Sequence, residues 1–271
     1  MWRHIGLSLG LGLGLGWGTA LAETQQGVHW DYQGTAGPEH WAELAPEFAL
    51  CQQGKMQSPI DLAAAYRQEP SLLPPAPLPP LEFFYQPVAV NLHNNGHTLQ
   101  QQSPPRSNSL VAFGKRFDLV QVHFHAPSEH QMRGQTYPVE AHLVHQATDG
   151  ELAVVGVFIQ RGAPNPTLQA LWLDPPAPGQ IRQQTDLPFN PRELLPRNRS
   201  YYFYLGSLTT PPCTEGVRWF VLRKPITASE TQLMRFTQHY THNTRPLQPL
   251  NHRRVSEAFQ PSLPLHYPNL P

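Results

Sequence analysis

Three histidines in two short segments have the spacing of a metal site. His123 and His125 lie in LVQVHFHAPSEH (residues 119–130), and His142 lies in VEAHLVHQ (residues 139–146). Both segments have the alternating pattern of a β-strand, in which every second residue faces the same side. If the two strands are neighbours, the three imidazoles converge on one point. Three neutral imidazoles suit Zn²⁺ and leave its fourth tetrahedral position open, which is typical of catalytic and not of structural zinc sites.

Each strand also carries a polar side chain two residues before a histidine, on the same face. Gln121 precedes His123, and Glu140 precedes His142. A metal-binding histidine usually donates its second ring N–H to a carboxylate, an amide or a carbonyl, so these two side chains are predicted acceptors. A single histidine in a half-polar sheet needs no metal; the combination favours one. His145 is out of phase with His142 and is predicted not to be a ligand.

Two other classes of protein share part of this pattern. Metal-dependent oxygenases of the cupin type, which are jelly rolls, use the spacing of His123, His125 and Glu129, with the glutamate as a ligand. Their flanking glycines are absent here, because Phe117 and Thr136 stand in those places. The second alternative is a non-catalytic binding module that has kept the fold and lost the metal. Retention of all three histidines disfavours it.

Seven motifs together resemble those of the secreted bacterial α-class carbonic anhydrases. They run from about Val28 to about Phe259, and they are GPEHW, QSPID, NNGH, HFHAPSEH, EAHLVH, SLTTPPC and NTRP. The resemblance implies a zinc enzyme that hydrates CO₂ reversibly to bicarbonate and a proton, through attack by a zinc-bound hydroxide. It also implies a central, largely antiparallel sheet of about ten strands with short peripheral helices, whereas the sequence alone indicates only an α+β fold.

The resemblance assigns catalytic roles to three residues and a supporting role to a fourth. Thr209 would accept the hydrogen of the zinc-bound hydroxide and donate its own to Glu129, which is acceptor-only when ionised. His97 would carry the proton outward, since an imidazole titrates near pH 7. The main-chain carbonyl of Asn243 would accept from His125. Without the resemblance, Thr209 is a turn residue, Glu129 a loop carboxylate and His97 an exposed residue after a hairpin turn.

Two further sets of residues follow from the same resemblance. A dry wall for the apolar substrate would consist of Val144, Val154, Leu208, Val217 and Trp219, although core packing explains each of them equally well. A polar wall that orders water towards His97 would consist of Tyr32, Asn95 and Gln100. Gln100 stands where many family members carry asparagine.

Eight strands are expected, with Val122 and Phe124 of the fourth facing the core. They are Leu81–Tyr85, Val88–Leu92, His97–Gln102, Phe117–Ala126, Val139–Gln146, Leu152–Gln160, Tyr201–Leu205 and Val217–Arg223. Glycine-containing loops between most of them favour antiparallel pairing. The proline-rich segment Pro70–Pro80 is predicted to be a surface loop, because motifs lie on both sides of it.

Helices are expected to be short and peripheral. Asn165-Pro166 and Asn190-Pro191 combine an N-cap with proline at the first helical position. Thr227-Ala-Ser-Glu230 is predicted to be a capping box that opens a helix through about Thr237, with apolar positions at Leu233, Met234 and Phe236.

The beginning of the chain predicts export. Residues 1–22 have the features of a secretory signal peptide, since Arg3 precedes an apolar Leu/Gly run and Ala20-Leu21-Ala22 fits the cleavage rule. The run is short and glycine-rich for a membrane-spanning helix. We therefore expect a periplasmic or secreted protein, not inserted in the membrane after cleavage, whose residues 23–271 form one catalytic domain.

The chain has two cysteines, Cys51 and Cys213. In an oxidising compartment one disulfide is the natural expectation, and two buried thiols are the alternative. Bridging would close a loop of about 160 residues and stabilise the fold by roughly 5 kcal/mol in the chain-entropy model. The family resemblance also implies this bridge.

Charge and length set further limits. The chain has 19 basic and 19 acidic residues and no charged run, so nothing indicates a nucleic-acid partner. Its 271 residues suffice for one large domain, and a homodimer is compatible with the sequence. The segment PLQPLNHRR after Arg245, which includes Arg253, is unusually basic and has no predicted role.

Overall fold

The computed structural model describes residues 28–62 and 78–259. The predicted signal peptide lies outside the described residues, and so does most of the proline-rich segment Pro70–Pro80. Within the described ranges, no helix has both the length and the apolar character needed to cross a membrane.

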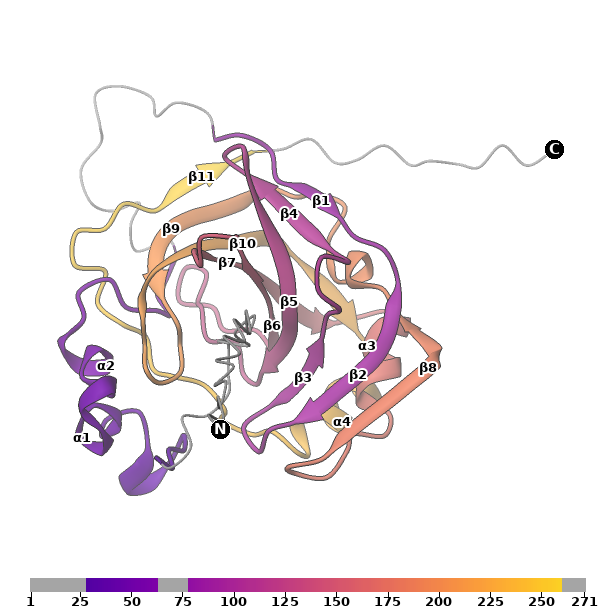
Figure 1. Ribbon diagram of the computed structural model, residues 1–271, viewed down its shortest axis with the longest axis horizontal. Coiled ribbons are helices and arrows are strands. Elements are labelled where there is room, and N and C mark those ends of the chain that lie inside the picture. Colours follow the sequence, from indigo (N-terminus) through magenta and orange to yellow (C-terminus); the bar gives the residue numbers. More distant parts are fainter. Residues whose placement is uncertain (1–27, 63–77, 260–271) are drawn as a thin grey trace, which may run out of the picture.

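One sheet of eleven strands dominates the molecule (Figure 1). Its order is β11-β9-β10-β7-β6-β5-β3-β2-β8, and β4 pairs with β5 and with β1. Every pair is antiparallel except β7 with β10, which is parallel. The strands are β1 (Glu82–Phe84), β2 (Val88–Asn94), β3 (Leu99–Gln102), β4 (Ser109–Ala112), β5 (Lys115–His125), β6 (Val139–Gln146), β7 (Leu152–Arg161), β8 (Ile181–Phe189), β9 (Tyr201–Ser207), β10 (Glu215–Ala228) and β11 (Ser256–Ala258). The prediction of a largely antiparallel sheet is confirmed.

All eight expected strands are present, and three others were not predicted. The missed strands are β4, β8 and β11. Two of them have only four and three residues, which is too short to display an alternation. The third, β8, forms an edge of the sheet, is largely exposed and contains Pro188, which argues against a strand in sequence. His97 was expected to begin the third strand, directly after a turn, but it lies in the turn itself, and β3 begins at Leu99.

Short helices surround the sheet. They are η1 (Gly34–Ala36), α1 (Trp41–Leu44), η2 (Pro46–Phe48), α2 (Leu50–Gln53), α3 (Pro166–Trp172), η4 (Pro191–Leu194) and α4 (Glu230–Thr237). Asn165 caps α3 through the amide of Leu168, and Asn190 caps η4 through the amide of Arg192. Both asparagine–proline starts are therefore confirmed.

The predicted capping box at Thr227 was wrong by two residues. Thr227 still belongs to β10, where it pairs with Gln160 of β7. The N-cap of α4 is Ser229, and its reciprocal hydrogen bonds are with Gln232. Sheet pairing thus prevails over the local capping signal. Met234, expected on the apolar face, is 49% exposed.

The two faces of the sheet bury different clusters. The larger one contains Val122 and Phe124, both fully buried, which confirms the predicted core face. The smaller one lies on the face of the three histidines and includes Val144, Val154 and Trp219. A third cluster packs around Trp41 of α1 and the two cysteines.

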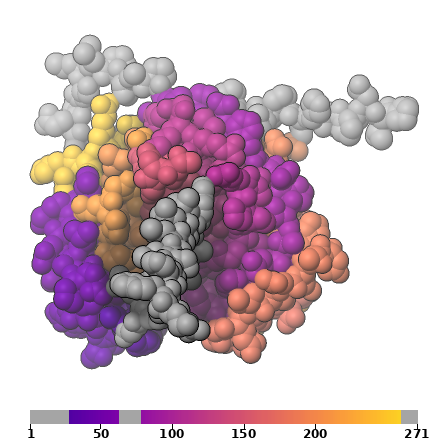
Figure 2. All heavy atoms as spheres, viewed as in Figure 1, coloured from indigo at the N-terminus to yellow at the C-terminus, as the bar shows by residue number. Residues whose placement is uncertain are grey.

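Cys51 of α2 and Cys213 form the expected disulfide, with a Cα–Cα distance of 5.0 Å. The bond joins the N-terminal segment to the loop between β9 and β10. In Figures 1 and 2 the indigo N-terminal segment lies beside the orange and yellow C-terminal segments, on the side away from β8. One covalent bond therefore fastens α2 to the loop that contains Thr209.

His145 lies on the face opposite the three histidines, as predicted from its strand phase. Its Nδ1 is 3.3 Å from the carbonyl oxygen of Ala153, and its Nε2 is 2.7 Å from the hydroxyl of Tyr85. The neutral tautomer that donates from Nδ1 and accepts at Nε2 satisfies both contacts. Burial lowers the pKa of His145 from 6.5 to about 4.

The free energy of unfolding is therefore expected to fall as the pH drops from 6.5 to about 4. In this pH window His145 is protonated in the unfolded chain but remains neutral in the folded protein. At about 1.4 kcal/mol per pH unit, the loss is about 3 kcal/mol, complete once the pH lies below the folded-state pKa. Urea denaturation of the wild type and of His145→Gln at several pH values measures this contribution. An identical pH dependence of the two proteins would contradict it.

Candidate active site

The pairing of β5 with β6 brings the three histidines together. His123 lies opposite His142, and His125 lies opposite Glu140. The ring centroids of the histidines are 4.6 to 5.1 Å apart. One ligand-capable nitrogen of each ring lies within 4.8 Å of the others. The convergence predicted from strand alternation is thus present.

Each ring is oriented by a hydrogen bond from one of its two nitrogens. The bonds are from His123 Nδ1 to Gln121 Oε1 (2.8 Å), from His125 Nδ1 to the main-chain oxygen of Asn243 (2.7 Å) and from His142 Nε2 to Glu140 Oε1 (3.0 Å). These are the three predicted acceptors. Nε2 of His123, Nε2 of His125 and Nδ1 of His142 are left for another partner.

The local environment keeps two of these imidazoles neutral. Burial lowers the pKa of His123 well below its ordinary value, and the neighbouring imidazoles lower it further. Burial also lowers the pKa of His125, against the opposing charge of Glu129. His125 Nε2 is buried and has no hydrogen-bond partner among the described residues. A neutral imidazole nitrogen that is buried and unpartnered fits a metal ligand.

Glu129 lies beside the cluster without joining it. Its Oε1 accepts a hydrogen bond from the main-chain N–H of Arg245 at 2.9 Å. Its Oε2 has no hydrogen-bond partner in the described part of the chain, and lies 3.5 Å from His125 Nε2 and 3.9 Å from His142 Nδ1. Thr209 is buried in the loop after β9, and no hydrogen bond of the described residues joins it to Glu129. The relay between them stays a prediction.

The five residues of the predicted dry wall lie together on the histidine face. Val144, Val154, Val217 and Trp219 are buried members of the smaller cluster, and Leu208 packs against it. The sheet register aligns three of them, because Val144 pairs with Val154 and Val154 pairs with Trp219. The ring centroids of Trp219 and His142 are 4.8 Å apart. An apolar wall therefore borders the histidines.

The three residues of the predicted polar wall border the other side. Gln100 lies opposite His123 in the pairing of β3 with β5. Asn95 donates from Nδ2 to Gln100 Oε1 at 3.4 Å, and its own Oδ1 accepts from the main-chain N–H of His97. Burial raises the pKa of the Tyr32 phenol well above its ordinary value, and the charge of Glu129 adds to this shift. These contacts connect the turn that holds His97 with the cluster.

The imidazole of His97 is half-buried against aromatic rings. It stacks on Trp30 with ring centroids 3.8 Å apart, and the ring of Tyr32 is 6.2 Å away. Partial burial lowers the pKa of His97 from its ordinary value. Sequence reasoning missed Trp30, whose only signal was its place in an aromatic N-terminal segment.

Comparison with known proteins identifies the family. Residues 36–259 match the family model of eukaryotic-type carbonic anhydrases. The chain belongs to the carbonic anhydrase family. It is 46% identical over 255 residues to a carbonic anhydrase of Nostoc sp., covering 94% of this chain and 95% of that protein. It is 41% identical to a carbonic anhydrase of Pectobacterium carotovorum, covering 86% of this chain and 93% of that one.

Solved structures agree with this assignment. The α-carbonic anhydrase of Thermovibrio ammonificans, solved with the inhibitor sulfanilamide, superposes with a TM-score of 0.78 at 46% identity, covering 84% of this chain and 99% of that one. The cupin alternative is thereby wrong. A jelly roll packs two sheets face to face, whereas this carbonic anhydrase fold is built on one large sheet.

Sequence reasoning missed a buried network behind the histidines of this carbonic anhydrase. His130 donates from its main-chain N–H and from Nδ1 to the two oxygens of Glu140, at 2.9 and 2.7 Å. Its Nε2 accepts from the hydroxyl of Tyr204 at 2.6 Å, and Ser58 lies 2.8 Å beyond. Glu140, His130 and His142 are also close enough for a metal, but their facing atoms already bond to one another. The network therefore orients Glu140.

The basic segment after Arg245 has a structural role. Arg253 is the best example, since its guanidinium donates to main-chain oxygens and packs 5.6 Å from the ring of Tyr204. The accepting residues are Leu205, Gln57, Pro249 and Leu250. Arg253 thus holds the C-terminal segment against the sheet and against the segment that follows α2.

Proposed function

We propose that this carbonic anhydrase family member is a zinc enzyme that hydrates CO₂ reversibly to bicarbonate and a proton. The observation that carries the proposal is the convergence of three oriented imidazoles, each of which keeps one nitrogen for a further partner. Their mutual distances of less than 4.8 Å suit a single ion. The residues that would hold Zn²⁺ are His123 and His125 through Nε2 and His142 through Nδ1.

The donor set fits zinc and leaves room for catalysis. Three neutral imidazoles provide three of four tetrahedral positions. When bound, Zn²⁺ supplies a water whose pKa is lowered to about 7, an effect for which carbonic anhydrases are the reference case. Gln121, Glu140 and the carbonyl of Asn243 would hold the rings in the tautomers that binding requires.

Thr209 and Glu129 would orient the nucleophilic oxygen. An ionised Glu129 only accepts, so its unpartnered Oε2 would take the hydroxyl hydrogen of Thr209. The oxygen of Thr209 would then accept the hydrogen of the attacking oxygen and turn a lone pair towards CO₂. The apolar wall of Val144 and its neighbours would provide a dry place for an apolar substrate. Thr209 and Glu129 belong to different loops, one after β9 and the other between β5 and β6.

We also propose that the protein is exported. The predicted signal peptide at residues 1–22 and the disulfide between Cys51 and Cys213 both suit a periplasmic or secreted protein.

The direct test measures metal content and CO₂ hydration in the same preparation. We expect about one zinc per chain, as a single tetrahedral site requires. Chelation should abolish hydration, and added zinc should restore it. Sulfanilamide, the inhibitor bound by the relative from T. ammonificans, is a suitable probe of the loaded site. Full hydration activity in a metal-free preparation would contradict the proposal.

His97→Ala should lower kcat in dilute, poorly accepting buffer and leave kcat/KM nearly unchanged. Each turnover must export one proton, and a histidine accepts it far better than bulk water does. A kcat loss of at least about tenfold is expected, because transfer to water is uphill by several pK units at about 1.4 kcal/mol each. Stopped-flow assays at low and high buffer concentration measure it, and added imidazole should restore the rate.

The matched control for this prediction is His93→Ala. His93 is also half-buried, its pKa is also lowered by burial, and it hydrogen-bonds to Asn91 away from the turn. Its variant should keep the wild-type kcat. If His97→Ala also keeps it in dilute buffer, His97 is not the shuttle.

A further inference from the structure

The segment between Asn243 and Arg245 presents two main-chain groups to the site. The carbonyl of Asn243 accepts from His125, and the N–H of Arg245 donates to Glu129 at 2.9 Å. This segment belongs to no helix or strand. Backbone hydrogen bonds hold the flanks, from His242 to Ala126 and from Gln248 to Pro59, and side-chain anchors hold the residues between them.

Asn243 is anchored by its own side chain. Its Oδ1 accepts from the main-chain N–H of Ala126 at 2.8 Å, and its Nδ2 donates to the carbonyls of Phe124 and His97 at 3.0 Å each. These bonds tie the start of the segment to the end of β5. They explain why the carbonyl of Asn243 can orient His125.

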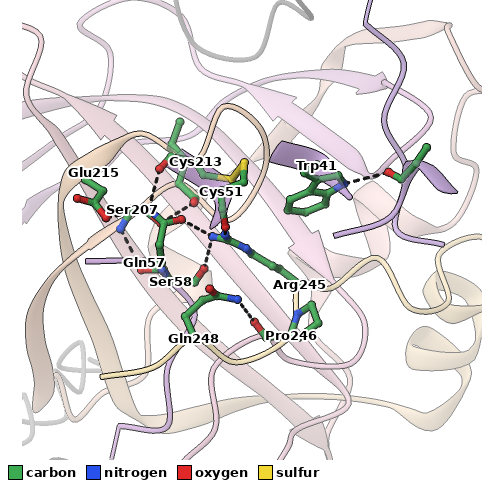
Figure 3. The surroundings of a disulfide bond; sticks show 12 residues. Trp41, Cys51, Gln57, Ser58, Ser207, Cys213, Glu215, Arg245, Pro246 and Gln248 are labelled. Carbon is green, nitrogen blue, oxygen red and sulfur yellow. Dashed lines mark hydrogen bonds between the residues drawn. A yellow bond between two sulfur atoms is a disulfide. The ribbon is translucent and has the colours of Figure 1, made fainter. Parts of the chain in front are cut away.

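Arg245 is anchored by its guanidinium, which points towards Cys51, Gln57 and Ser58 (Figure 3). Arg245 is only 3% exposed, and its guanidinium carbon lies 5.7 Å from the centroid of the Trp41 ring. Its donors reach Gln57 Oε1 (2.8 Å), the carbonyl of Ser58 (2.9 Å) and the carbonyl of Cys51 (2.6 Å). Gln57 in turn donates from Nε2 to the carbonyl of Cys213. The guanidinium of Arg245 is therefore anchored to the residues around the Cys51–Cys213 disulfide.

The acceptors of this buried cation are all neutral. No salt bridge of the described residues includes Arg245. Burying a cation without a counter-ion in contact is costly, so its hydrogen bonds must be well formed. The planar fork of arginine can serve three acceptors in fixed directions, which the point charge of lysine cannot do.

We propose that the guanidinium of Arg245 is a positioning group for Glu129. The guanidinium donates to the main-chain carbonyls of Cys51 and Ser58 and to the side-chain oxygen of Gln57. These bonds fix the position of the main-chain N–H of Arg245. That N–H holds Oε1 of Glu129, and Oε2 consequently faces the site. The inference rests on the proposed function, because Glu129 matters there as the acceptor for Thr209. It makes the disulfide-bonded N-terminal segment a part of the catalytic architecture.

The first test compares Arg245→Lys with a matched control, Arg253→Lys. Arg253 is also an arginine that donates to several carbonyls and contacts Gln57, but none of its partners is Glu129 or a proposed ligand. Arg245→Lys should keep about one zinc per chain and lose about tenfold in kcat/KM for CO₂ hydration. Arg253→Lys should keep the wild-type kcat/KM. Wild-type kcat/KM in zinc-loaded Arg245→Lys would overturn the proposal.

The second test asks whether Arg245 acts through Glu129. Glu129→Gln keeps an oxygen for the N–H of residue 245 but no longer accepts from Thr209 as a carboxylate does. In that background, Arg245→Lys should cause no further loss of kcat/KM, although losses in thermal stability should still add. An equal tenfold loss in both backgrounds would mean that Arg245 acts elsewhere.

The third test needs no turnover. In zinc-free protein, exchange of the residue 245 amide hydrogen should be slow in the wild type and in Arg253→Lys, and faster in Arg245→Lys. Unchanged exchange in Arg245→Lys would overturn the inference. Absence of CO₂ hydration in the wild type would instead contradict the proposed function. Because this exchange measurement does not depend on activity, the two failures are distinguishable.

Discussion

Replacing His123, His125 or His142 with alanine is expected to remove both the zinc and the CO₂ hydration activity. Each of these imidazoles would provide one of only three protein ligands. With two ligands left, we expect the zinc to dissociate when the protein is diluted during gel filtration. The loss also removes the nucleophile, because water that is not bound to zinc has a pKa about nine units higher. Metal analysis after gel filtration and a stopped-flow hydration assay on the same sample measure both effects.

The matched control is His145→Gln, which changes a histidine of the same strand. His145 lies on the opposite face of β6 and bonds to Tyr85, so its variant should lose stability and retain zinc. A zinc-loaded, active His142→Ala protein would contradict the proposed ligand set. So would loss of zinc from folded His145→Gln.

Thr209→Ala and Glu129→Gln are expected to keep zinc and lose about a hundredfold in kcat/KM, the order of effect seen when a reacting group is misaligned. The nucleophile remains in both variants, but no acceptor sets its orientation. The two changes act on the same relay, so the double variant should be little worse than either single variant. Zinc analysis with stopped-flow kinetics at saturating buffer separates orientation from proton export.

The outcome that would contradict this relay is loss of zinc on Glu129→Gln. Oε2 of Glu129 lies only 3.5 Å from the ring nitrogen of His125, so the carboxylate is close enough for that result to be informative. It would make Glu129 a metal ligand and leave Thr209 without its acceptor.

Strand phase was readable from the sequence. In an extended chain the side of each side chain follows from its position alone, whatever the strand pairs with. The alternation therefore predicted that His123, His125 and Gln121 share one face, that Val122 and Phe124 occupy the other, and that His145 is not part of the cluster. The structure bears out each of these placements. The motifs were also readable from the sequence, because each of them is a contiguous run of residues.

Contacts between distant parts of the chain were readable only in part. The sequence suggested the pairing of Cys51 with Cys213 because there were no other cysteines, and the partner of His125 came from family resemblance. The positions of Trp30 and His130, and the true cap of α4 at Ser229, were missed. Each of them depends on an element far away, such as β7, which keeps Thr227 in the sheet.

Arg245 illustrates most clearly what the tertiary structure alone decided. In sequence it lies in the NTRP motif, directly before the basic segment, and no role was predicted for its side chain. In the folded chain its side chain reaches residues nearly 200 positions away, with a separation of 194 from Cys51, while its main-chain N–H contacts Glu129. Local pattern determines which face of a strand a side chain occupies, because φ and ψ repeat. It cannot determine where an irregular segment lies, because that position depends on which distant carbonyls its side chains reach once the sheet has formed.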